Sequence, residues 1–297
     1  MKNRYNQAEI ISEKLRQHES HIFTPSQIIN SKPEIEKVIL INHLENSGVG
    51  GAIATGYKWC QQHGIDCTAV MAGDGQMDPA ELESICKPVI EGNIDYVKGN
   101  RLIHRSAWLI VPKIRYFGNS ILSILTKVAS GYWHVSDTQT GYTAISKKAL
   151  NAIRIHKIYK SYGMPNDMLV KLNIAFCTLK EVEIKPIYDI GEQSKMKIFK
   201  VVPRISWLLC KNFFKCLWIK YLFRDFHPLF LLYHFALLLF VFAFPYGIKI
   251  LLILFVYERA LNPVTMLAFV FLFISSFQSF LFAIWMDIQD NERLYKS

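Results

Sequence analysis

The chain has 297 residues and a formal net charge of +10, a length that suits one α/β domain plus an additional segment. Its six cysteines form no Cys-x-x-Cys pair and no metal-ligand spacing with the histidines. This argues against a zinc module and favours buried or reduced thiols. Residues 1–20 are polar and charged, so we expect no signal peptide.

Apolar runs of strand length alternate with segments of helical spacing along the first two thirds of the chain. Such alternation argues for an α/β fold with a mostly parallel sheet. After a polar N-terminal part, the expected strands are Val38–Ile41, Cys67–Ala72, Tyr96–Gly99, Thr143–Ile145 and Leu179–Ile187. The expected helices are Ala8–Gln17, Ala52–Gln62, Pro79–Glu91, Trp108–Ala129 and Asn166–Phe176.

The run Ala72–Pro79 follows the second of these strands and carries Asp74 in a turn of small residues. Asp78 suits the N-cap of the next helix, and Pro79 suits its first position. The Asp74 carboxylate lies at the carboxyl edge of the predicted sheet, with the Gln76 amide two residues further on. Such oxygens suit a hard divalent cation held against phosphate. An ordinary turn with a solvated aspartate is the alternative that the residues alone leave open.

Two stretches without charged residues, 228–248 and 262–286, are each long enough to cross a membrane as a helix. Charged residues between them predict a helical hairpin. Pro245 leaves the end of the first span open, because it either bends or ends the helix. Two buried helices of a soluble domain are the alternative.

The segment before the hairpin, 199–226, mixes basic residues with aromatic and aliphatic ones and has one acid, Asp225. This composition is typical of an amphipathic segment in the headgroup region of an anionic leaflet. No nucleic-acid motif accompanies the charge, so we expect no nucleic-acid partner. By the positive-inside rule this flank is cytoplasmic, and two spans place both termini there. The basic residues are Lys200, Arg204, Lys211, Lys215, Lys220 and Arg224.

A series of ordered motifs resembles the family 2 glycosyltransferases, in particular the polyprenyl-phosphate glycosyltransferases related to dolichyl-phosphate mannose synthase. The resemblance extends from about Val38 to the C-terminal hairpin. It implies a GT-A-like, Rossmann-like domain over 1–198, a juxtamembrane segment over 199–227, a transmembrane hairpin over 228–287 and a cytoplasmic tail over 288–297. The motifs are the glycine-rich stretch 46–56, AGDGQMDP at 72–79, KGNR at 98–101, DTQTG at 137–141, the Asn166-Asp167 helix start, EVEI at 181–184 and GEQSK at 191–195.

Two departures from the family pattern stand out. The family's metal motif is usually Asp-x-Asp-x-Gln, but Ala72 occupies the first position here. The family also normally opens with two strands and the turns that seat the nucleotide base and ribose. Neither turn is found, and residues 6–17 are similar to the helix that should follow the second one. We therefore expect an N-terminally incomplete domain.

The resemblance implies transfer of a sugar from a nucleotide-diphosphate sugar to a polyprenyl phosphate, dolichyl or undecaprenyl, with inversion. Asp74 and Gln76 would hold Mg²⁺ or Mn²⁺ on the donor diphosphate. Anionic substrates held close together need cationic groups around them. The implied residues are Asp74, Asp137 and Arg101 for catalysis, Gly50, Gly51, Asp74, Gln76 and Arg101 for the donor diphosphate, and Arg115, Ser194 and Lys195 for the acceptor phosphate.

Other functions stay open. The missing nucleotide-binding turns also suit a catalytically impaired fragment or a membrane scaffold. A family 2 transferase with another acceptor is a further alternative, although the Gln-x-x-Arg-Trp motif of processive synthases is absent. The sequence leaves the oligomeric state, the sugar and the nucleotide open.

Overall fold

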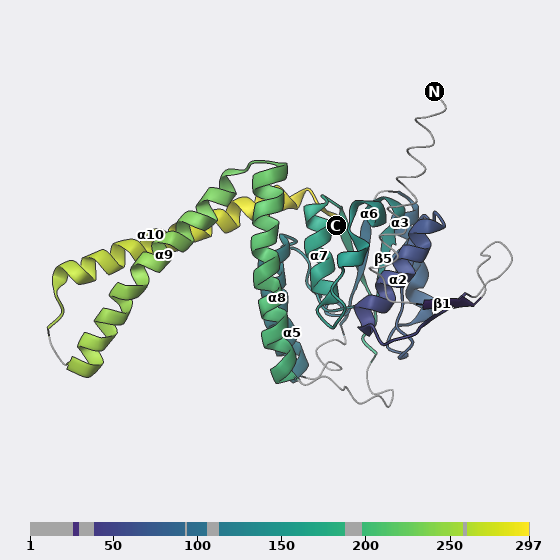
Figure 1. The fold of residues 1–297 in the computed structure, drawn as a ribbon, viewed down its shortest axis with the longest axis horizontal. Helices are drawn as coiled ribbons and strands as arrows, with labels where there is room; N and C mark the ends of the chain where they lie inside the picture. The colour runs from purple at the N-terminus through teal and green to yellow at the C-terminus, as the bar shows by residue number, and fades with distance from the viewer. Residues whose placement is uncertain are drawn as a thin grey trace, which may run out of the picture.

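The computed structural model describes residues 26–29, 39–92, 94–105, 113–187, 198–257 and 260–296 (Figure 1). They form a globular α/β part, a long helix beside it and a helical hairpin that extends away from both. The expected helix at Ala8–Gln17 lies outside the described residues. The other expected elements are found, with bounds that differ by a few residues.

The main sheet has five strands in the order β3-β5-β4-β6-β7. The sheet is mixed: β3, β4, β6 and β7 run in one direction, as expected of a mostly parallel sheet, whereas β5 runs antiparallel to both of its neighbours, β3 and β4. The loop before β5 reverses the chain at the edge where β3 and β4 end. The strands are β3 (Cys67–Val70), β4 (Tyr96–Asn100), β5 (Thr143–Ser146), β6 (Leu179–Glu183) and β7 (Tyr295–Lys296).

The strand expected at Val38–Ile41 does not join this sheet. It forms β2 (Leu40–His43), which pairs antiparallel with β1 (Ser26–Ile29). Side chains of β2 alternate between exposed and half-buried, so this strand adds little to the core.

Helices cover both faces of the main sheet and bury its apolar side chains. The larger core cluster joins α2, α6 and α7 to the sheet, and a smaller one lies under α3. Asp78 accepts a hydrogen bond from the Ala80 N–H, with Pro79 at the first helical position, which confirms the predicted helix start. The helices are α2 (Gly48–Gln62), η1 (Pro79–Glu81), α3 (Leu82–Ile90), α5 (Lys113–Ser130), α6 (Lys147–Ala152), η2 (Ile155–Lys157) and α7 (Met164–Ile174).

The basic segment forms the long helix α8 (Ile198–Trp218), which continues as the π-helix η3 (Ile219–Arg224). Helix α8 lies beside α5, and α7 also contacts it (Figure 1). Its exposed side chains include Arg204, Trp207 and Lys211, and its position at a membrane surface stays a prediction. Lys220 differs from that expectation, because its side chain is 1% exposed and lies among polar partners.

The hairpin consists of α9 (Pro228–Leu252), extended by η4 (Ile253–Tyr257), and α10 (Pro263–Glu292). Both helices are long and apolar enough to cross a membrane, and most of their residues are not buried within the protein. Helix α9 continues through Pro245 rather than ending there. After α10 the chain returns to the globular part, where β7 becomes the edge strand of the main sheet (Figure 1).

Candidate active site

Three loops meet at one edge of the main sheet. The register pairs Val70 and Lys98 with Thr143, so β3 and β4 end where β5 begins. The loop with Asp74, the loop after β4 and the loop that precedes β5 therefore share this edge. A hydrogen bond of 2.9 Å from the Tyr142 hydroxyl to the Asp78 carbonyl ties two of them together. Loops at the carboxyl ends of strands are where open α/β sheets bind ligands.

Asp74 lies half-buried in the turn after β3. Its Oδ1 accepts a hydrogen bond of 3.1 Å from the Gln76 N–H, which closes an Asx-turn. Gln76 is also half-buried. The turn thus brings the carboxylate and the amide of the predicted cation site into one short segment.

Arg101 and Asp137 form a hydrogen-bonded ion pair at this edge. Arg101 Nε donates to Asp137 Oδ2 at 2.8 Å and Nη2 donates to Oδ1 at 3.2 Å. The N–H groups of Gln139 and Thr140 also donate to Oδ1 of this carboxylate. Burial alone would raise the pKa of Asp137, but the Arg101 charge and hydrogen bonds, together with Lys98, lower it below its usual value. Asp137 is therefore a fixed anion that orients Arg101.

Lys98 and Glu181 complete this cluster, although neither was assigned a role from the sequence. Lys98 is fully buried in β4, and its Nζ donates to the Thr140 carbonyl at 2.5 Å. Burial lowers the pKa of Lys98 to about 8, against the opposing effect of Asp137 and Glu181. The Glu181 carboxylate accepts from the N–H groups of Ser136 and Asp137 at 3.0–3.1 Å. The available signal for Lys98 was a lysine inside a strand whose residues are all buried, whereas Glu181 lies between two other charged residues of β6 and had no such signal.

The Asn166-Asp167 pair lies in the first turn of α7 and has two roles. Asn166 accepts from Gln139 Nε2 at 2.9 Å, which supports the loop that carries Asp137. Asp167 accepts from the Tyr159 N–H, from Lys171 and from Asn212 of α8. The hydrogen bond between Asp167 and Asn212 joins the globular part to the long helix α8.

The remaining predicted residues are less well defined. Gly50 packs so closely on the backbone of Tyr159 that a Cβ would lie 1.9 Å from its carbonyl oxygen, and its N–H donates to the Lys160 carbonyl. The structure thus gives this glycine a packing role, and Gly51 lies next to it in α2. The Arg115 backbone lies in the first turn of α5. Ser194 and Lys195 lie outside the described residues.

Comparison with known proteins finds a family model that matches part of the chain. Residues 24–154 match the model of glycosyl transferase family 2. Over these residues the chain is similar to the family 2 glycosyltransferases. The matched residues include Asp74, Arg101 and Asp137, whereas Glu181, α8 and the hairpin lie beyond them. The matched family has the GT-A fold, and the mixed sheet with its covering helices is consistent with that fold.

Three relatives are similar to this domain. The UDP-N-acetylglucosamine–dolichyl-phosphate N-acetylglucosaminyltransferase of Methanococcus voltae is 36% identical over 157 residues, which cover 51% of this chain and 60% of that protein. An uncharacterized protein of Methanocaldococcus jannaschii is 31% identical over 52% of this chain and 63% of its own length. The undecaprenyl-phosphate mannosyltransferase of Micrococcus luteus is 27% identical over 46% of this chain and 55% of that protein. The chain thus spans less than two thirds of each relative.

A cation bound at this edge of the sheet would find few protein ligands. The described residues contain no group of three or more His, Cys, Asp or Glu side chains arranged to hold a metal. Asp74 and Gln76 supply one carboxylate and one amide, both partly accessible to solvent. This donor set fits Mg²⁺ or Mn²⁺ when substrate oxygens and water complete the shell, because Mg²⁺ keeps several non-protein ligands.

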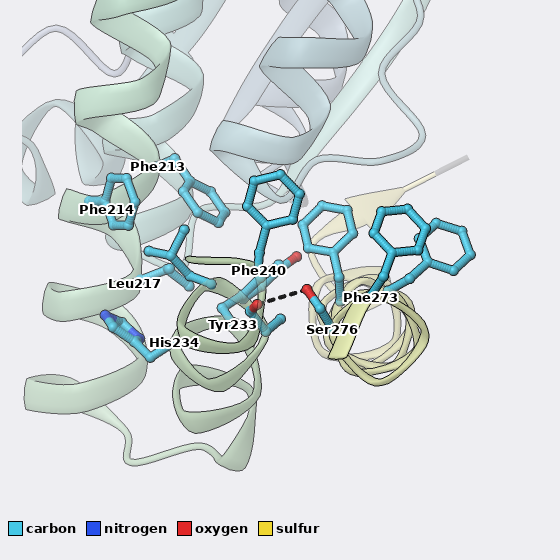
Figure 2. A pocket seen from close by; sticks show the side chains of 12 residues that line it. Phe213, Phe214, Leu217, Tyr233, His234, Phe240, Phe273 and Ser276 are labelled. Carbon is cyan, nitrogen blue, oxygen red and sulfur yellow. Dashed lines mark hydrogen bonds between the residues drawn. The ribbon is translucent and has the colours of Figure 1, made fainter. Parts of the chain in front are cut away.

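An apolar cavity of about 360 Å³ lies between α8 and the hairpin. Figure 2 shows aromatic side chains from α8, α9 and α10 converging on it. Its lining contains Phe213, Leu217, Tyr233, Phe240, Phe273 and Phe277 among others. A cavity of this composition suits a hydrocarbon chain rather than a polar ligand.

Proposed function

We propose that this chain transfers a sugar from a nucleotide-diphosphate sugar to a polyprenyl phosphate, with inversion at the anomeric carbon. The single observation that carries the proposal is the Lys98–Arg101–Asp137 cluster, within the residues that match the family 2 model, of a chain that continues into two membrane-length helices. Two relatives named for transfer to dolichyl and undecaprenyl phosphate support the same acceptor class.

The proposed chemistry needs two anions held close together and in line. Arg101, oriented by Asp137, would bind phosphate oxygens, and the positive charge of Lys98 would offset the buried carboxylates beside it. Arg115, Ser194 and Lys195 would bind the acceptor phosphate. That phosphate is already anionic near neutral pH, so the cluster does not have to supply a strong general base.

Asp74 and Gln76 would hold a divalent cation against the donor diphosphate. Bound there, Mg²⁺ or Mn²⁺ would stabilise the negative charge that develops on the leaving diphosphate. The acceptor chain would lie in the bilayer and enter the apolar cavity between α8, α9 and α10. The exposed basic residues of α8 would lie on the cytoplasmic leaflet, with both termini on that side.

The test is a transfer assay with the purified chain in detergent or nanodiscs. It is supplied with a panel of nucleotide sugars, Mg²⁺ or Mn²⁺, and a polyprenyl phosphate. Radiolabelled sugar recovered in the lipid fraction as polyprenyl-phosphate sugar is the result that would support the proposal. Label in a polymer fraction would indicate another acceptor. Binding of neither a nucleotide sugar nor the lipid would favour a scaffold.

A further inference from the structure

The end of α10 and the strand after it contact the segment that leads into the Asp137 loop. Asn291 packs against Gly131, where a Cβ would lie 2.7 Å from its Nδ2 and where φ is +73°. The Trp133 indole N–H donates to Asp287 Oδ2 at 2.7 Å. The Tyr295 and His134 rings lie with their centroids 5.2 Å apart. We call Asp287, Asn291 and Tyr295 the C-terminal clamp.

A second set of contacts, through strands β7 and β6, connects the C-terminal clamp to the loop that carries Asp137. Strand β7 pairs in parallel with β6, and the Leu179 N–H donates to the Leu294 carbonyl at 2.7 Å. The Tyr295 hydroxyl interacts with the Glu181 carboxylate on β6. Glu181 in turn accepts from the backbone N–H groups of Ser136 and Asp137. Two independent routes therefore connect the end of the hairpin to the backbone of Asp137.

A buried polar network fixes the clamp to the globular part. Lys220 Nζ lies 3.0 Å from the Asp290 carboxylate and donates to Asn173 at 2.9 Å and to Asn291 at 2.5 Å. The Tyr221 hydroxyl donates to Asp287 at 2.6 Å. Loss of one partner from such a network leaves a buried charge or polar group unpaired, which is costly. The hairpin end is thus held in one arrangement.

We propose that the C-terminal clamp positions Asp137, so that the membrane hairpin is a structural part of the active site and not only an anchor. This inference rests on the proposed glycosyl transfer for its catalytic consequence, but the positioning of the loop is measurable without any substrate. If the hairpin were only an anchor, changes in the clamp would leave the loop at 136–141 unaffected.

The experiment compares three variants of the full chain in nanodiscs. Trp133→Phe removes one N–H and keeps an aromatic ring, and Tyr295→Ala removes the contacts with His134 and Glu181. Glu292→Ala is the matched control, because Glu292 is an exposed neighbour of Asn291 at the same helix end. Amide hydrogen exchange over residues 131–141, and kcat and KM for transfer, are measured well below the Tm of each variant.

We expect Trp133→Phe and Tyr295→Ala to speed exchange of the Ser136 and Asp137 amides by about tenfold or more. We also expect kcat/KM to fall about tenfold per folded molecule, with Glu292→Ala unchanged in both respects. Wild-type exchange rates in both Trp133→Phe and Tyr295→Ala would overturn the inference. Faster exchange with unchanged kcat/KM would overturn its catalytic part. If the wild type transfers no sugar, the proposed function fails, while the exchange rates still decide whether the clamp holds the loop.

Discussion

The Arg101 guanidinium donates two hydrogen bonds, of 2.8 and 3.2 Å, to the Asp137 carboxylate, which is 1% exposed. Thirty-six positions separate the two residues, so the pair joins the loop after β4 to the loop before β5. Because the carboxylate also accepts backbone N–H groups from its own loop, the guanidinium is held in a fixed orientation toward the sheet edge.

Removing this carboxylate charge is expected to impair both folding and transfer. Asp137→Asn leaves Arg101 largely buried without its counter-charge, which should lower the free energy of unfolding by about 3 kcal/mol. Turnover should fall by roughly a hundredfold, because Arg101 loses its orientation. The matched control is Asp66→Asn, which breaks the exposed Lys147–Asp66 pair and should change stability by less than about 0.5 kcal/mol. Urea denaturation and the transfer assay measure both effects, and equal losses in the two variants would contradict the prediction.

Substitutions of the two aspartates in the turn after β3, Asp74 and Asp78, should have different effects on transfer and on stability. Asp74→Ala removes the carboxylate of the proposed cation site, so transfer should fall by about two orders of magnitude or more and should show little dependence on Mg²⁺. Asp78→Ala removes the side-chain cap of η1 and should mainly cost about 1 kcal/mol of stability. Metal titrations of activity and thermal melts distinguish them. Comparable losses of turnover with unchanged melts would refute this division of roles.

Because the pKa of buried Lys98 is lowered, we expect activity and stability to change in opposite directions with pH. Its pKa is lowered to about 8 in the folded chain, so the unfolded chain binds more protons between pH 8 and the ordinary value of 10.5. The contribution of Lys98 to the free energy of unfolding should therefore rise with pH across that window. Activity should fall over the same range, because the neutral amine no longer offsets Asp137 and Glu181. Activity profiles and denaturation between pH 7 and 10 test this, and a flat activity profile would contradict it. Lys98→Arg should move the decline to higher pH.

The apolar cavity predicts a chain-length effect on the acceptor. Leu237 lines the cavity, whereas Leu238, which is similarly exposed on the same helix, is not among its lining residues. Leu237→Trp should fill part of the cavity and raise KM for a long polyprenyl phosphate by about tenfold, with little change for a short soluble analogue. Leu238→Trp should leave both values unchanged. The same rise for both acceptors would indicate that the cavity does not bind the chain.

Membrane association should depend on the hairpin and not on surface charge alone. Helices of this length and apolar content are able to cross the hydrocarbon core, and if they do, alkaline carbonate should leave the full chain in the membrane pellet. A peripheral protein held by the basic side chains of α8 would be released by the same treatment. Immunoblots of pellet and supernatant distinguish the two.

The local features of this chain were predictable from short stretches of sequence. The turn with Asp74, the Asp78 cap and the two uncharged spans depend on neighbouring residues, through capping, turn chemistry and the length of an apolar run. The ordered motifs also indicated the family that residues 24–154 match.

Only the tertiary structure decided which distant groups meet. The antiparallel direction of β5, the partner of Arg101, the burial of Lys98 and Lys220, and the return of β7 to the sheet all depend on contacts between segments far apart in the chain. A basic residue on an amphipathic helix has the same local pattern whether it faces lipid or an acidic partner. Its environment is set by the elements that pack against that face, and residue order alone does not specify that packing.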